Sequence, residues 1–140
     1  MSEQQNLDAV RTIYAAFGRG DLERIVAALD PQVSWRTPGA PDLPTGGLRR
    51  GVSEVREFFG LLLDTFDFEE FRPTDFLAQE DKVVVLGTSR EGPKGSGRVV
   101  DFRWVHVFTF RSGKIVEFEE PADVGALVEE FRRARAMRHP

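Results

Sequence analysis

The sequence predicts an α+β fold, in which helices come first and a run of antiparallel strands follows. Four segments carry apolar residues at helical spacing, at positions 3–17, 22–29, 52–66 and from 123 onward. Four other segments alternate apolar and polar residues as strands do, at positions 33–37, 68–77, 82–90 and 98–123. No internal repeat, linker or low-complexity segment divides the chain, so a single domain over residues 1–140 is expected.

The first two helices are separated by a short glycine-containing segment. Gly18 ends the first helix, and Asp21 is a good N-cap for the second. Asp30 and Pro31 are expected to end the second helix, because proline lacks the N–H group that a helical hydrogen bond requires.

The middle of the chain predicts a strand, a long loop and a third helix. Val33, Trp35 and Thr37 share one face of the short strand. Glycines and prolines are frequent at positions 38–51, so this segment is expected to be the longest irregular loop. The third helix has an apolar inner face formed by Val52, Val55, Phe58, Phe59, Leu62, Leu63 and Phe66. A glycine-rich turn over residues 91–97 then leads into the last pair of strands.

A β-hairpin over residues 98–123 places a histidine and a glutamate among apolar side chains. The even positions of its first strand are Val100, Phe102, Trp104, His106, Phe108 and Phe110. The odd positions are more polar, which is typical of a strand with one buried face. His106 therefore lies on the apolar side, where a titratable ring is either a core histidine with a partner or the polar point of a ligand cavity.

The turn of this hairpin decides whether Glu120 shares the face of His106. Residues 111–113 fit a three-residue loop closed by a glycine in the left-handed region. That loop pairs Phe118 with His106 and leaves Glu120 diagonal to the ring, within reach of a long side chain. A two-residue turn would shift the pairing by one residue and send Glu120 to the opposite face.

Composition and charge argue against several classes of function. A net charge of −4, without a basic run interleaved with aromatic residues, argues against nucleic-acid binding. There is no cysteine, and only His106 and His139 could offer an imidazole, so no metal site is expected. No apolar run approaches the length of a membrane span, and the N-terminus lacks a signal-peptide core. We therefore expect a cytoplasmic protein without a membrane partner.

Three motifs make the chain resemble a known family. They are Gly20-Asp21 after an aromatic helix end, Val33-x-Trp35, and Gly113-Lys114-Ile115 followed by Asp123. Over essentially its whole length, the sequence resembles the SnoaL-like group of the ketosteroid isomerase and nuclear transport factor type superfamily. The resemblance implies an α+β barrel: a cone-shaped, curved antiparallel sheet wrapped around N-terminal helices, with a pocket between sheet and helices and a C-terminal helix. It specifies the fold better than the chemistry, since this scaffold hosts many unrelated functions.

The resemblance also implies which residues line the pocket. Carried over residue by residue, they are Tyr14, Trp35, Thr37, Phe59, Trp104, His106, Phe118, Glu120 and Asp123. The alternation in the hairpin independently places His106 and Glu120 on one face. These two residues and Asp123 are the candidate catalytic residues, and the other six are candidate binding residues. A small hydrophobic ligand and a homodimer are the partners that the resemblance implies.

Several positions depart from well-known members of the superfamily. Where ketosteroid isomerases carry an aspartate base and an oxyanion-binding aspartate, this chain has Thr37 and His106. The Asp-Arg-Asp set of the epoxide hydrolases would need a carboxylate where Gly92 stands. The polyketide cyclase branch works without a cofactor and pairs a carboxylate with a pocket histidine. His106 with Glu120 or Asp123 resembles that pattern most, so no cofactor is expected.

Three functions stay open at this point. The first is acid/base catalysis of the isomerase, cyclase or hydrolase type on a small, mostly apolar molecule, with His106 polarising an oxygen and Glu120 or Asp123 moving a proton. The second is a binding protein with the same pocket, and the third is a dimeric interaction module that uses the outer face of the sheet. Each residue also has a structural explanation, with His106 as a paired core residue, Glu120 as a solvated strand residue and Asp123 as a helix cap.

Overall fold

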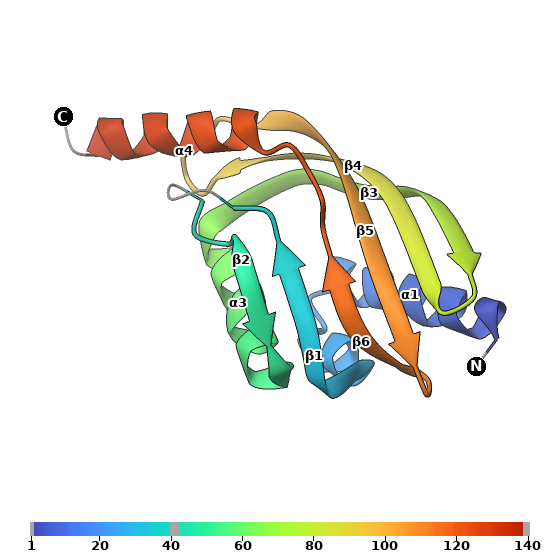
Figure 1. The fold of residues 1–140 in the computed structure, drawn as a ribbon. Helices are drawn as coiled ribbons and strands as arrows, with labels where there is room; N and C mark the ends of the chain where they lie inside the picture. Colours follow the sequence, from blue (N-terminus) through green and yellow to red (C-terminus); the bar gives the residue numbers. More distant parts are fainter. Residues whose placement is uncertain (1, 40–42, 139–140) are drawn as a thin grey trace.

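The computed structural model describes residues 2–39 and 43–138, which form helices and a curved sheet (Figure 1). The helices are α1 (Glu3–Gly18), α2 (Leu22–Val26), α3 (Gly51–Thr65) and α4 (Gly125–Arg138). The strands are β1 (Leu29–Thr37), β2 (Gly47–Arg50), β3 (Phe66–Gln79), β4 (Lys82–Pro93), β5 (Val100–Arg111) and β6 (Lys114–Glu119). The predicted α+β fold is confirmed. None of the helices in the described part of the chain is long and apolar enough to span a membrane.

The sheet differs from the expected one in direction and closure. Within the described residues it has six strands in the order β2-β1-β6-β5-β4-β3. All neighbouring strands are antiparallel except β1 and β6, which run parallel, so the sheet is mixed rather than antiparallel. The direction of β6 is set by its hairpin with β5, and that direction happens to match β1. Strands β2 and β3 lie at opposite edges, so the sheet stays open and does not close into a barrel.

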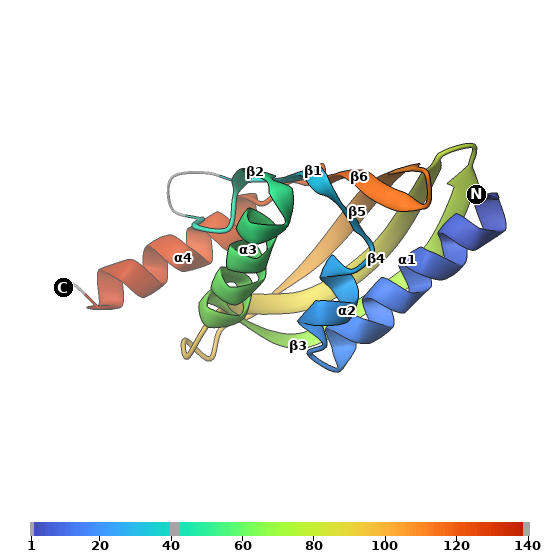
Figure 2. The same cartoon turned by 90° about the horizontal axis from the view of Figure 1, so that it is seen from below.

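Helices α1 and α3 lie across the concave face of the sheet, where the main core forms between them and the strands (Figure 2). Val10 and Ile13 of α1 are buried, in agreement with the predicted helical spacing. Asp21 caps α2 as expected, since its carboxylate accepts a hydrogen bond from the N–H of Arg24 at 3.1 Å. Leu63, expected on the inner face of α3, is instead 50% exposed.

Helix α4 runs across one end of the sheet and extends beyond it (Figure 1). It joins a second core cluster made of Leu43, Phe66, Leu127, Val128 and Phe131. Arg98, in the connection between β4 and β5, forms an ion pair with Glu130 of α4, with 2.5 Å between Nε and Oε2. The predicted C-terminal helix is thus present, and it covers the end of the sheet at which β4 finishes.

Three element boundaries differ from those expected. Helix α2 ends at Val26, and Leu29 to Pro31 already belong to β1, because Leu29 pairs with β6. Strand β2 lies inside the segment expected to be a loop, where its four residues pair with β1. Strand β4 continues through Glu91 to Pro93 instead of turning, because β3 pairs with it along this whole stretch and β5 still pairs with Glu91.

The hairpin between β5 and β6 has a two-residue turn, so the predicted three-residue loop is wrong. Arg111 pairs directly with Lys114, which leaves only Ser112 and Gly113 in the turn. Both turn residues have a positive φ, of 51° and 81°, as in a type I′ turn. This turn twists in the same sense as the strands that it joins, which explains why a non-glycine residue is accepted in the left-handed region.

An extra residue in β6, Val116, compensates for the short turn. The register shifts by one residue within the hairpin, as a β-bulge causes. Phe118 consequently pairs with Phe108, and not with His106 as predicted. The even positions of β5 nevertheless share a face with Phe118, and Glu120 follows on the His106 side.

Candidate functional site

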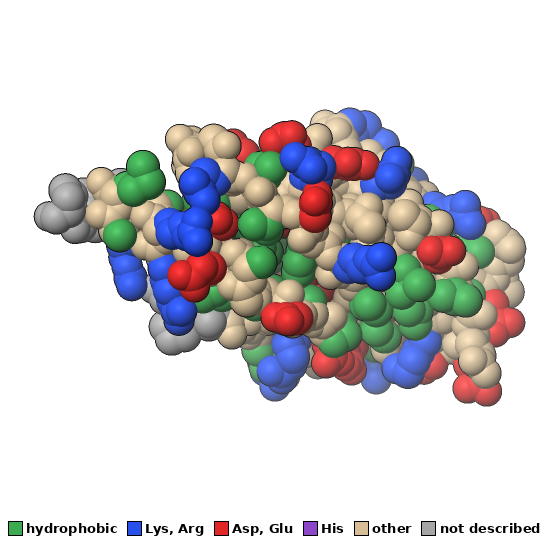
Figure 3. Space-filling model, turned by 90° about the horizontal axis from the view of Figure 1, so that it is seen from above, with side chains coloured by type: hydrophobic (Ala, Val, Ile, Leu, Met, Phe, Trp, Pro, Cys, Tyr) green, Lys and Arg blue, Asp and Glu red, His purple; other side chains and the backbone are tan. Residues whose placement is uncertain are grey.

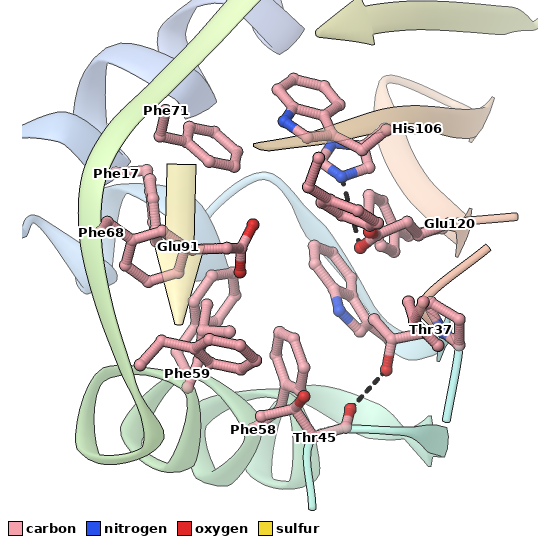
Figure 4. A pocket seen from close by; sticks show the side chains of 18 of the residues that line it. Phe17, Thr37, Thr45, Phe58, Phe59, Phe68, Phe71, Glu91, His106 and Glu120 are labelled. Carbon is pink, nitrogen blue, oxygen red and sulfur yellow. Dashed lines mark hydrogen bonds and ion pairs between the residues drawn. The ribbon is translucent and has the colours of Figure 1, made fainter. Parts of the chain in front are cut away.

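A cavity lies between the concave face of the sheet, helices α1 and α3, and the start of α4 (Figure 4). It has about 100 Å³ of free space, well above what one water molecule needs. All the predicted site residues except Asp123 line it, namely Tyr14, Trp35, Thr37, Phe59, Trp104, His106, Phe118 and Glu120. Even-numbered residues of β5 and residues of helices α1 and α3 therefore line the same cavity.

One wall of the cavity is a stack of rings built on β5. The Trp104 ring stacks with the rings of both His106 and Phe71, with centroids at 4.1 and 4.8 Å and planes within 18° of parallel. Gly87, the partner of Trp104 on β4, makes room for the indole. A Cβ atom on Gly87 would lie 2.1 Å from Cζ2 of Trp104. The ring stack therefore depends on a glycine at this point of the neighbouring strand.

A second wall comes from the parallel pairing of β1 and β6. Trp35 is the sheet partner of Phe118, and their rings stack with centroids 3.9 Å apart. Phe59 of α3 meets the Trp35 ring edge-on, at 5.6 Å. The indole Nε1 atoms of Trp35 and Trp104 are buried and have no hydrogen-bond partner among the described residues. These walls are apolar, so a ligand would be held mainly by ring contacts.

His106 is held between a tyrosine and a glutamate. The hydroxyl oxygen of Tyr14 lies 2.6 Å from Nδ1 of His106, and Oε1 of Glu120 lies 3.4 Å from Nε2. Burial, and secondly the negative charge of Glu120, raise the pKa of Tyr14 well above its ordinary value of 10.0. The phenol therefore keeps its proton and can donate it in the hydrogen bond to His106.

One tautomer of the neutral His106 ring fits this arrangement. A neutral imidazole has one donor and one acceptor nitrogen, so a ring that accepts from Tyr14 at Nδ1 carries its proton on Nε2, toward Glu120. Both nitrogens are then engaged by protein groups. The polar atom that remains open to a ligand at this point of the cavity belongs to Glu120, which His106 orients.

The end of β6 places Glu120. Its backbone N–H donates a hydrogen bond of 2.9 Å to the carbonyl of Arg36, which ties the end of β6 to β1. Its side chain is 17% exposed and points to the cavity beside His106 (Figure 4). The bulge at Val116 is what brings it there, since without that extra residue the short turn would have directed it outward.

Glu91 lines the cavity although the sequence interpretation placed it in a turn. It is 6% exposed, and its Oε1 accepts a hydrogen bond of 2.5 Å from the hydroxyl of Ser89. Burial raises the pKa of Glu91 from 4.5 to about 7; the Ser89 hydrogen bond lowers it and the charge of Glu120 adds to the rise. The signal was present in the sequence, because Glu91 continues the buried odd positions of β4 that begin at Val83 and Val85.

Thr37 and Asp123 are occupied by structural contacts. The hydroxyl of Thr37 lies in the cavity wall and donates to the carbonyl of Thr45 at 2.6 Å, while Arg49 donates to the Thr37 oxygen at 3.3 Å. Asp123 is exposed, is not part of the cavity wall, and accepts a hydrogen bond of 2.9 Å from the N–H of Gly125 at the start of α4. The geometry therefore matches the capping alternative for Asp123. His139 lies outside the described residues.

This chain is similar to two bacterial proteins and to a third protein, TerC. A Mycobacterium tuberculosis (strain H37Rv) protein described as uncharacterized is 31% identical over 135 residues, covering 94% of this chain and 98% of that protein. An NTF2-like protein of unknown function from Burkholderia pseudomallei is 32% identical, with a TM-score of 0.82 and coverage of 94% and 98%. TerC, crystallized with polyporic acid, is 29% identical, with a TM-score of 0.82 and coverage of 91% and 98%.

Family membership rests on sequence and on fold. The model of the SnoaL-like domain matches residues 10–118, from the middle of α1 to Phe118 in β6. The fold matches that of the solved NTF2-like protein over nearly the full length of both chains. The chain belongs to the SnoaL-like domain family.

Proposed function

We propose that the cavity binds a small, mostly apolar molecule and that Glu120, oriented by His106, moves a proton on it. The observation that carries this proposal is the chain of contacts from Tyr14 through His106 to Glu120, which ends at the cavity. The similarity to TerC, which was crystallized with polyporic acid, supports a small-molecule ligand.

The chemistry needs no group beyond the protein. In the proposed step the Glu120 carboxylate takes a proton from a carbon next to a carbonyl of the ligand. The electron pair of the broken C–H bond forms the carbon–carbon double bond of an enolate, and the proton later returns to the ligand. His106 would stabilise the carboxylate before the step through its Nε2 proton, and Tyr14 would keep the imidazole in that orientation. His106 and Tyr14 would in this way hold Glu120 in position to act as a base in the cavity wall.

Binding can be followed through the protein's own fluorescence. The chain has two tryptophans, Trp35 and Trp104, and both lie in the cavity wall. We expect the neutral bicyclic ketone 2-tetralone and its oxygen-free analogue tetralin to change this fluorescence in a saturable way. The variant Leu62→Phe, which adds bulk to the wall, should weaken the effect of both probes. A fluorescence that changes only linearly, up to the solubility limit of each probe, would contradict ligand binding in the cavity.

Proton transfer needs a separate readout. 2-Tetralone exchanges the hydrogens next to its carbonyl for deuterium in heavy water, and proton NMR measures that rate. The wild-type protein should accelerate exchange, and Glu120→Gln should reduce the acceleration by about 10²-fold or more, the usual contribution of a general base. Glu119→Gln is the matched control, since that neighbouring carboxylate is exposed. Equal exchange rates for the Glu120→Gln variant and the wild type would contradict proton transfer by Glu120. Ligand binding in the cavity would then be the function that remains.

We also propose that a second copy of the chain covers the outer face of the sheet. On that face Leu86 pairs with Val105, and Val84 pairs with Val107, so four apolar side chains lie together across β4 and β5. Leu86 is 38% exposed, and Figure 3 shows hydrophobic side chains gathered among charged ones on the face seen from above. Sedimentation equilibrium should give a dimer for the wild type and a monomer for Leu86→Lys. A monomeric wild type at high concentration would overturn this proposal.

A further inference from the structure

Glu91 is a buried carboxyl group that the proposed proton transfer does not use. It sits on β4 and points into the cavity, on the side opposite His106 and Glu120 (Figure 4). Its position follows from the alternation of β4, whose odd residues face the core. The ligand space therefore lies between two carboxyl groups that belong to different strands.

The protein offers Glu91 few partners. Only Oε1 has a hydrogen-bond partner among the described residues, the Ser89 hydroxyl two positions earlier on the same strand. No lysine or arginine lies in the described cavity wall or within ion-pair distance of Glu91. A buried carboxyl group with one partner destabilises a fold, and an apolar residue would fill the same place at lower cost. Stability therefore does not explain this residue.

The groups around Glu91 favour its protonated form. Facing it are Ser89 on β4, Glu120 after β6, His106 on β5 and Tyr14 on α1. Burial and the charge of Glu120 raise the pKa of Glu91 to about 7, despite the lowering effect of Ser89. Near neutral pH a large share of the molecules therefore carries a carboxylic acid at this position, and a carboxylic acid can donate a hydrogen bond.

We propose that Glu91 is a ligand-binding residue whose carboxylic acid donates a hydrogen bond to an acceptor oxygen of an uncharged carbonyl compound. This inference rests on the proposed function and names its ligand class. The carbonyl oxygen of the ligand lies at Glu91, the carbon next to that carbonyl faces Glu120, and the apolar body lies against the rings of Trp35 and Trp104. An anionic ligand should bind more weakly, because it would meet two acidic groups and no lysine or arginine in the described wall.

The test compares three probes of similar size: 2-tetralone, tetralin and 2-naphthoate. Tryptophan fluorescence gives the Kd of each between about pH 6 and about pH 8. In the wild type the affinity for 2-tetralone should fall as Glu91 loses its proton, by about tenfold per pH unit once the pH exceeds the pKa. Tetralin, which has no oxygen, should bind with the same affinity throughout, and 2-naphthoate should bind at least tenfold more weakly than 2-tetralone at the lowest pH.

Two variants assign the effect to Glu91. In Glu91→Gln the amide donates a hydrogen bond at every pH, so the affinity for 2-tetralone should no longer depend on pH, whereas Glu119→Gln should behave like the wild type. In Ser89→Ala the pKa of Glu91 should rise, because the hydrogen bond that lowers it is gone. The pH at which 2-tetralone affinity declines should then move upward, which gives a second readout if Glu91→Gln folds poorly.

The outcomes separate this inference from the proposed function. A pH-independent affinity of the wild type for 2-tetralone would overturn the role of Glu91, as would a pH dependence that persists unchanged in Glu91→Gln. In either case tetralin and 2-tetralone would still bind, so the cavity would remain a ligand site. Failure of all three probes to bind would instead contradict the proposed function itself.

Discussion

The hydroxyl of Tyr14 lies 2.6 Å from Nδ1 of His106, across a separation of 92 residues in the sequence. This hydrogen bond joins helix α1 to the middle of β5 and fixes the orientation of the imidazole. Tyr14 also stacks on Trp104, with ring centroids 5.8 Å apart, so its position depends on the ring stack as well. The N-terminal helix therefore contributes to the geometry of the site and not only to the core.

Tyr14→Phe should destabilise the protein while preserving its fold. The ring contacts remain, but Nδ1 of His106 loses its partner in a buried position. Leaving a buried polar group unpaired costs about 1–3 kcal/mol of unfolding free energy. Urea denaturation measures the difference from the wild type, and a variant as stable as the wild type would argue against this hydrogen bond.

The ionisation of Tyr14 can be followed directly, because it is the only tyrosine in the chain. The tyrosinate absorbance should develop at a clearly higher pH than the ordinary pKa of 10.0, because burial and Glu120 raise the pKa. Glu120→Gln should lower the midpoint by removing a negative charge. Since the folded pKa is the higher one, the contribution of Tyr14 to stability is present below pH 10.0 and is lost above it. A midpoint at the ordinary value would contradict the burial of this hydroxyl.

Glu91 should make the stability of the protein depend on pH in the acidic to neutral range. Its pKa is about 7 in the folded protein and 4.5 ordinarily, so its stabilising contribution is complete below pH 4.5 and is lost as the pH rises toward 7. The loss should be at most about 3 kcal/mol. Glu91→Gln removes this ionisation, so the variant should become more stable than the wild type above neutral pH. Parallel stability curves for the two proteins, from urea denaturation across this range, would contradict the raised pKa.

Gly87→Ala should destabilise the protein by displacing Trp104. The added Cβ would lie 2.1 Å from the indole, and overpacking of this kind costs about 1–3 kcal/mol. Gly60→Ala in α3 is the matched control, because the added methyl group there meets no atom within 4 Å. That change should stabilise the helix by about 0.5–1 kcal/mol. Urea denaturation measures whether the unfolding free energy falls in Gly87→Ala and rises in Gly60→Ala. Tryptophan fluorescence should change only in Gly87→Ala.

Asp123→Ala should affect helix α4 rather than the cavity. The carboxylate of Asp123 accepts from the N–H of Gly125, and losing such a cap costs about 1 kcal/mol. Asp123→Asn keeps an acceptor oxygen and should stay close to the wild type. The affinity for 2-tetralone should change less than twofold in both variants. A large loss of affinity would restore Asp123 as a residue of the site.

The part of the cavity built on β5 could be predicted from the sequence because a strand repeats every two residues. His106 and Trp104 follow from this alternation alone. Glu120 was placed on the right face for a reason that is only partly correct. The assumed three-residue turn was wrong, and the bulge at Val116 offset the error. The shorter turn and the bulge each shift the strand pairing by one residue, so their effects on the face of Glu120 cancel. Neither feature leaves a clear local signal in the sequence.

Features that depend on distant pairing could not be predicted. Strand β2 is short and follows a glycine- and proline-rich segment, so only its pairing with β1 makes it a strand. The parallel contact of β1 with β6 depends on the order of the whole sheet. Glu91 was missed because Gly92 and the glycines after it indicate a turn, although the strand continues between two paired neighbours.

The bulge in β6 has a consequence for insertions and deletions in this hairpin. Glu119 and Glu120 are adjacent, so a change of one residue in the length of the strand would turn Glu119 inward as Glu120 turned outward. A carboxylate would end the strand inside the cavity in either register. Phe118, by contrast, would leave its stack with Trp35. A change of one residue in the length of β6 would therefore change the shape of the cavity but leave a carboxylate in its wall.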